Sequence, residues 1–254
     1  MSVWKVRTDS LNLRSTPEKV DDNIIRALPL AQEVKVIAGA SVDRWWKVET
    51  VIDGASLTGF VSSAFLRQPL GAKKEALLSA AVTEWLRFNM GNGLETRDPY
   101  YKYVGEYWQK LNLPHDGRDT EIYWSAVFIS FIARKAGYDN FKFSSAHHTY
   151  IRDSVKKRIS GDSSSPFWGF RLNEHKPQLG DLVCLWRENS PVTFDNIPSD
   201  FFPSHCDIVV EIRDTEVRAL GGNIGNSVSM STFQLDSNGF LKSGKVFAVL
   251  RNNM

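Results

Sequence analysis

The sequence has few of the features that mark membrane proteins or disulfide-stabilised secreted proteins. No apolar run is long enough to span a bilayer, and the N-terminal segment enters a strand-like pattern without an apolar signal region. We therefore expect synthesis as a soluble cytoplasmic protein without membrane insertion. Only two cysteines are present, Cys184 and Cys206, each within an apolar strand-like run. This setting favours two buried thiols over a disulfide framework.

The sequence also lacks a charge excess and a metal-binding motif. Its 31 basic and 29 acidic side chains nearly cancel, so it lacks the strong positive field that nucleic-acid binding usually needs. No His-Glu-x-x-His motif occurs. The adjacent His147 and His148 do not form a ready metal pair, because neighbouring helical side chains diverge by about 100°. We expect no metal, no other cofactor and no nucleic-acid partner.

What is present is enough apolar content for two domains. The chain has 254 residues, 42% of them hydrophobic, which is sufficient to bury one large core or two unequal cores. Residues 68–74 have the proline, glycine and charge content of a linker, and a helical pattern follows them. We predict a first domain over residues 1–69 and a second over residues 70–254.

The first of these regions is typical of a small all-β barrel. Five short alternating runs are separated by turn residues: Trp4–Val6, Leu11–Arg14, Glu33–Ile37, Trp45–Glu49 and Gly59–Val61. The segments Leu11–Pro17, Trp45–Val48 and Gly59–Leu66 resemble the bacterial SH3-like domain. That resemblance implies attachment to cell-wall peptides. A barrel that only packs against its neighbour remains the alternative, because a fold does not by itself give a function.

The second region combines helices with a sheet. Apolar residues recur at helical spacing from Leu77 to Phe88, and aromatic residues recur from Tyr100 to Leu111. A further helix opens near Tyr123, with Ser125 in its first turn. From residue 180 to residue 251 the chain is mostly strand-like, so a sheet packed on the Ser125 helix is the simplest architecture. The fold class expected for the whole chain is α+β.

Four segments of the second region carry a resemblance to a known superfamily. They are Tyr123–Ser130, Gly180–Val183, Ser204–Val210 and Gly221–Asn223. Their order of helix, strand, His-bearing strand and Asn-bearing strand resembles the NlpC and CHAP cell-wall hydrolases, which are relatives of papain. The resemblance implies a papain-like domain with helices on an antiparallel sheet. In that superfamily the helix residue is normally cysteine, whereas this sequence has Ser125.

Position and chemistry make Ser125 a candidate nucleophile. A group in the first turn of a helix feels the positive end of the helix dipole, and nearby backbone amides can form an oxyanion hole. A serine hydroxyl is far less acidic than a thiol, so it needs a base to remove its proton during attack. The resemblance assigns this role to His205. A structural strand histidine is the alternative.

A second group should orient the imidazole of His205. The resemblance points to a polar residue on the next strand, for which Asn223 is our choice. Asp207 competes for the role, because strand alternation places it on the same face as His205. A plain turn remains an alternative for Gly221–Asn223, since all three residues tolerate positive φ.

Three further residues are candidates for substrate contact. Trp124 precedes the nucleophile, and His148 and Tyr150 occupy the place where the superfamily lines its cleft. The insertion between Arg187 and Ser204 could form a cleft wall, with Phe201 and Phe202 covering the site. Ordinary loop packing is the alternative there.

Together these observations predict a peptidoglycan-directed amide hydrolase, either an amidase or an endopeptidase. A catalytically silent pseudoenzyme that binds wall peptide is the main alternative. A cysteine enzyme inactivated by a Cys-to-Ser substitution is another. Action in the periplasm or cell wall would need delivery after synthesis, by phage lysis or a secretion apparatus. If the protein is an injected antibacterial toxin, an immunity protein should plug its cleft.

Overall fold

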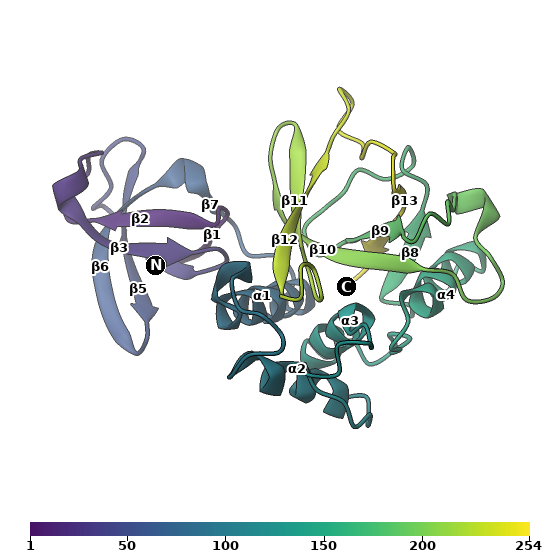
Figure 1. Cartoon of the computed structure of the whole chain (residues 1–254). Helices are drawn as coiled ribbons and strands as arrows, with labels where there is room; N and C mark the ends of the chain where they lie inside the picture. Colours follow the sequence, from purple (N-terminus) through teal and green to yellow (C-terminus); the bar gives the residue numbers. More distant parts are fainter. The chain divides into compact units, whose positions relative to one another are not determined.

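The computed structural model describes residues 1–254. The chain forms two compact units, Met1–Gly71 and Ala72–Met254. Figure 1 shows strands without an α-helix in the first unit and α-helices beside strands in the second. The protein is therefore α+β. None of its helices is long and apolar enough to cross a membrane.

The first unit is a seven-stranded antiparallel sheet in the order β3-β2-β6-β5-β4-β1-β7. Its strands are β1 (Ser2–Val6), β2 (Ser10–Arg14), β3 (Ile24–Pro29), β4 (Glu33–Val36), β5 (Trp45–Ile52), β6 (Ala55–Ser62) and β7 (Leu66–Arg67). Short 3-10 turns lie at Asp21–Asn23 and Ser63–Phe65. The core between the strands includes the fully buried Val6, Leu13, Leu28, Val34, Val48 and Val61.

The five predicted runs correspond to β1, β2, β4, β5 and β6, and the structure adds two strands. Both additions, β3 and β7, lie at the edges of the sheet. Strand β3 is mostly exposed and ends at Pro29, so it lacks the alternation that marks a half-buried strand. Strand β7 is only two residues long. Edge strands of this kind leave little apolar pattern in a sequence.

The second unit contains four α-helices and a six-stranded antiparallel sheet in the order β12-β11-β10-β9-β13-β8. The helices are α1 (Ala72–Arg87), α2 (Tyr100–Gln109), α3 (Ser125–Lys135) and α4 (His147–Ile159), and a 3-10 turn lies at Asn89–Gly91. The strands are β8 (Phe167–Phe170), β9 (Leu182–Trp186), β10 (Ser204–Ile212), β11 (Glu216–Gly221), β12 (Ser229–Gln234) and β13 (Val246–Asn252).

Helix α3 is the central helix of this unit. It contacts helices α1 and α2 and strands β10 and β11, and α1 lies beside it against the same two strands (Figure 1). This position explains its composition, because all residues from Ser125 to Ala133 are buried. A helix that is apolar all round needs partners on all sides. The arrangement fixes the first turn of α3 against the strand that begins at Ser204.

Candidate active site

Ser125 is the first residue of α3, and the residue before it is locked in the core. The Trp124 side chain is 2% exposed and packs against the rings of Phe88 and Tyr107, with centroid distances of 5.9 Å in both pairs. Its indole Nε1 donates a hydrogen bond to Glu95 Oε2 at 2.5 Å. Trp124 therefore anchors the start of the helix, and it is not among the residues that line the adjacent pocket.

A pocket of about 570 Å³ opens at this helix start. Its lining includes Ser125 and Ala126 from α3, His147 from α4, His205 from β10, and Asn223 from the turn after β11. The first-turn amides of α3 have no side-chain cap. Free amides at a helix N-terminus favour an anion, so this end of the pocket suits a developing oxyanion.

The histidine that contacts Ser125 is His147. Its Nε2 lies 2.7 Å from the Ser125 Oγ, and its Nδ1 is hydrogen-bonded to the Tyr150 hydroxyl. No hydrogen bond joins Ser125 to His205, so the contact expected there is replaced by one to a residue of helix α4. His147 and Tyr150 are three residues apart, which places them on one face of the helix and allows their contact.

His147 is held neutral by its surroundings. Burial, followed by the charge of His205 and then that of Arg187, lowers the pKa of His147 well below its usual value. His147 is also the first residue of α4, where the positive end of the helix dipole disfavours an imidazolium. A neutral imidazole can accept a proton, which is what a base beside a serine must do.

His205 forms a second pair with a carboxylate. Its Nε2 lies 2.7 Å from Asp207 Oδ1, and both side chains are buried. The centroids of the His205 and His147 rings are 5.0 Å apart. Asp207, and not Asn223, thus contacts the imidazole of His205. Gly221 makes room for this carboxylate, because a Cβ there would lie 1.9 Å from Asp207 Oδ1.

Asn223 lies in the pocket but has a different partner. Its φ of 58° turns the chain after β11, and its Nδ2 donates to Glu95 Oε2 at 2.6 Å. The same Glu95 oxygen receives the Trp124 indole, so one buried carboxylate joins the residue before Ser125 to the pocket rim. The preceding Gly222 packs on α3, since a Cβ there would lie 2.5 Å from the Phe128 Cβ.

The other predicted contact residues lie outside the pocket lining. Tyr150 is fully buried beneath His147. His148 points elsewhere on α4, and its ring centroid lies 5.2 Å from that of Phe201 and 6.0 Å from that of Phe202. Burial, followed by the charge of Arg152, lowers the pKa of His148. Tyr150 therefore supports the pocket through His147, whereas His148 packs under the insertion that leads to His205.

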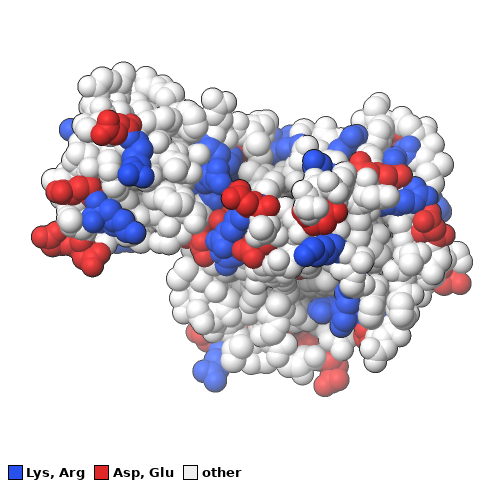
Figure 2. Space-filling model, turned by 90° about the horizontal axis from the view of Figure 1, so that it is seen from above, with Lys and Arg blue, Asp and Glu red and all other residues white.

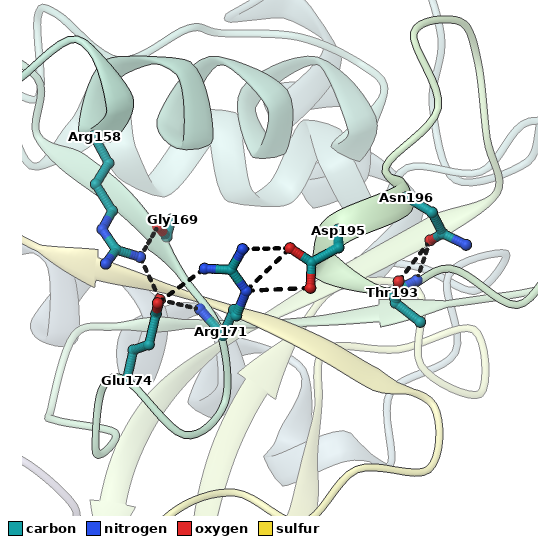
Figure 3. Close-up of polar contacts among 7 residues, drawn as sticks. All are labelled: Arg158, Gly169, Arg171, Glu174, Thr193, Asp195 and Asn196. Atoms are coloured by element: carbon teal, nitrogen blue, oxygen red, sulfur yellow. Dashed lines mark hydrogen bonds and ion pairs between the residues drawn. The ribbon is translucent and has the colours of Figure 1, made fainter.

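That insertion forms part of the pocket wall. Phe201 and Phe202 line the pocket, and Phe201 is 71% exposed. Figure 3 shows how the middle of the insertion is tied down. The Arg171 guanidinium binds Asp195 of the insertion and, at 2.9 Å, Glu174, which also pairs with Arg158 of α4 at 2.5 Å. The insertion on this side of the pocket is thus attached to the rest of the second unit by a series of ion pairs.

The two cysteines lie away from the pocket. Their Sγ atoms are 3.3 Å apart on the paired strands β9 and β10. Burial, together with the neighbouring Cys184, raises the pKa of Cys206 well above its usual value. A buried thiol of this kind is a poor nucleophile. No group of three or more His, Cys, Asp or Glu side chains is placed to hold a metal ion.

Sequence reasoning missed two residues of this site. His147 was considered only as half of a possible metal pair with His148, although its spacing from Tyr150 was a usable signal. Glu95 had no signal, because its partners Trp124 and Asn223 are 29 and 128 residues away in the sequence.

Comparisons with known proteins give one firm result. The solved structure of NlpC2 from Trichomonas vaginalis is 12% identical, with a TM-score of 0.35 over 99% of this chain and 72% of that chain. NlpC1 from the same organism is 10% identical, with a TM-score of 0.32 over 95% and 68%. These likenesses are too faint to establish a shared activity. No protein with a curated description matches the sequence. A family model matches residues 96–251, and the chain therefore belongs to the family described as "Uncharacterized protein conserved in bacteria (DUF2272)".

Proposed function

We propose that the second unit is a serine hydrolase that cleaves an amide bond of a cell-wall peptide. The observation that carries this proposal is the 2.7 Å contact between the Ser125 Oγ and the Nε2 of the neutral His147, at a helix start that lines a pocket. A hydroxyl in contact with a neutral base is the minimum arrangement for nucleophilic acyl transfer by serine.

In this reaction the Ser125 Oγ attacks the amide carbonyl carbon while its proton passes to His147 Nε2. The carbonyl oxygen becomes an anion beside the first-turn amides of α3. His147 then gives its proton to the leaving nitrogen as the C–N bond breaks. Water attacks the acyl ester, with His147 again accepting a proton, and the acid and the free serine are regenerated.

This role requires the His147 tautomer in which Nδ1 carries the hydrogen. Nδ1–H would donate to the Tyr150 hydroxyl oxygen, which leaves Nε2 free to accept from Ser125. Burial, followed by the neighbouring thiols of Cys206 and Cys184, raises the pKa of Tyr150 well above its usual value. Its hydroxyl therefore stays neutral and orients the ring without forming an ion pair.

The cell-wall substrate rests on the resemblances in the sequence. On this proposal the first unit is an SH3-like module that holds wall peptide. It carries its own pocket of about 630 Å³, whose lining includes Trp45, Phe65 and Arg44. An aromatic and cationic lining suits a peptide ligand. An immunity protein that plugs the Ser125 pocket is proposed only for the case of a delivered toxin.

One observation favours a second candidate function, a peptide-binding pseudoenzyme. His205 is the base that the resemblance to NlpC and CHAP enzymes implies, and it makes no hydrogen bond to Ser125. In this alternative, Ser125 has replaced a catalytic cysteine. His147 now contacts Ser125, and its ring lies 5.0 Å from that of His205. The pocket would then bind peptide without cleaving it.

Incubation with isolated peptidoglycan, followed by mass spectrometry of the released fragments, tests these alternatives. The proteins compared are the starting chain, Ser125→Ala, Ser125→Cys, and the control Ser163→Ala, which removes an exposed hydroxyl outside the pocket. We expect fragments from the starting chain and from Ser163→Ala, and none from Ser125→Ala. Fragments from Ser125→Cys alone would indicate the pseudoenzyme, and silence from every protein would reject a wall hydrolase.

A further inference from the structure

Two cations stand unpaired at one side of the Ser125 pocket. Arg187 directly follows β9, Lys245 directly precedes β13, and both are exposed and line the pocket. Neither forms an ion pair, and the Lys245 ammonium lies over the Trp186 ring at 5.3 Å from its centroid. Arg158 and Arg171, by contrast, have carboxylate partners. The pocket therefore presents positive charge that the protein does not neutralise.

Backbone hydrogen bonds hold the chain segments that carry these two residues in place. The Trp186 amide donates to the Lys245 carbonyl at 3.0 Å, and the Arg187 amide donates to the Pro203 carbonyl at 3.0 Å. Pro203 is two residues before His205, so the Arg187 backbone is attached to the strand that carries the second histidine. Arg187 and His147 line the same pocket, and the charge of Arg187 contributes to the lowered pKa of His147 after burial and His205.

The acidic residues that line the pocket do not neutralise the positive charges of Arg187 and Lys245. Glu121 and Glu188 are the carboxylates in the lining, and neither pairs with Arg187 or Lys245. Glu121 belongs to the segment before Ser125, and the backbone φ of 54° at Glu188 marks a turn after Arg187. The wider surface is mixed in sign, as Figure 2 shows for one face. The pocket lining thus contains two cations without a carboxylate partner.

We infer that the pocket recognises a carboxylate of its substrate through Arg187, with Lys245 adding to the attraction. The substrate class is a peptide that carries a free carboxylate within a few bonds of the amide facing Ser125. A guanidinium binds a carboxylate through two parallel hydrogen bonds, and an ammonium adds a point charge. Cleavage of that peptide rests on the proposed function, but carboxylate recognition can be measured without cleavage.

The experiment measures binding of two wall stem peptides that differ only in one group, a glutamate α-carboxylate that is either free or amidated. Calorimetry with Ser125→Ala prevents turnover. We expect the free carboxylate to bind about 10- to 100-fold more tightly, the range given by hydrogen bonds to charged groups. Arg187→Gln should remove most of this preference, and Lys245→Gln should remove a smaller part. The control Arg97→Gln changes an exposed, unpaired arginine outside the pocket and should leave the preference intact.

The outcomes separate this inference from the proposed function. Equal affinity for both peptides, or a preference that survives Arg187→Gln in a variant of unchanged melting temperature, would overturn the inference. Absence of binding to either peptide would also overturn it. If the preference is found while the starting chain releases no fragments from peptidoglycan, the inference stands and the hydrolase proposal fails. If the starting chain cleaves both peptides with the same kcat/KM, the hydrolase proposal stands and the inference fails.

Discussion

His147 and His205 face the same pocket from different elements, and their partners differ. His147 begins helix α4 and lies between two hydroxyls, those of Ser125 and Tyr150. His205 begins strand β10 and contacts the carboxylate of Asp207. A buried imidazole between neutral groups favours the neutral form, whereas a carboxylate stabilises an imidazolium. Of the two, only His147 contacts the candidate nucleophile, and only His205 contacts a carboxylate.

The charge of His205 also acts on its neighbour. The two ring centroids are 5.0 Å apart, and the charge of His205 is the second cause of the lowered pKa of His147, after burial. A proton on one ring therefore disfavours a proton on the other. A carboxylate partner therefore does not by itself identify the base in this pocket. His205 has such a partner, but His147 is the histidine that contacts Ser125.

The largest expected effect distinguishes the two histidines directly. His147→Ala should lower kcat/KM for wall peptide by about 10²- to 10⁴-fold, because this is the range of a general base. His205→Ala should cost less, since it removes a neighbour of the base and leaves the Ser125–His147 contact in place. Steady-state rates of both variants, with circular dichroism as a check on folding, provide the measurement. A greater loss in His205→Ala than in His147→Ala would transfer the role of base to the strand histidine.

The contact between His205 and Asp207 could be predicted from the sequence, whereas the contacts of His147 could be predicted only in part. His205 and Asp207 are two apart in an apolar run, so strand alternation alone predicts that they share a face. The contact between Ser125 and His147 joins two helix starts that are 22 residues apart. Helical spacing links His147 to Tyr150, but no local rule states which helix start will meet another.

The same limit applies to the fold. Periodicity located the central strands and the helix of Ser125, where burial is almost continuous. It gave no separate apolar run for β8 and β12, which form the two edges of the second sheet. Strand β12 is partly exposed along most of its length, and β8 is a four-residue strand with a glycine. Their placement is decided by pairing with a neighbour and not by an apolar pattern of their own.

A substitution at Gly221 offers a way to disturb the contact between His205 and Asp207. A Cβ at Gly221 would lie 1.9 Å from Asp207 Oδ1, so Gly221→Ala should displace the carboxylate from His205. We expect the free energy of unfolding to fall by about 1–3 kcal/mol, as for other overpacked sites. Urea denaturation checks this value. Gly71→Ala is the matched control, because its Cβ would have no atom within 4 Å. Equal stability of the two variants would show that Asp207 has room to move.

The smallest expected effect concerns the ion pairs that hold the insertion leading to His205. The hydrogen bond from Arg158, followed by bonds from Arg171, lowers the pKa of Glu174 to about 2. An unfolded glutamate titrates near a pKa of about 4.3, so the unfolded chain takes up this proton first as the pH falls. The stabilisation by Glu174 is therefore complete above this value and is lost as the pH falls towards 2.

The denaturation midpoint of the starting chain should consequently exceed that of Glu174→Gln at pH 7, and the difference should disappear near the pKa of about 2. Asp214→Asn, which changes an exposed carboxylate without an ion pair, should show no such dependence. A difference that persists unchanged to pH 2 would mean that Glu174 acts through packing and not through its charge.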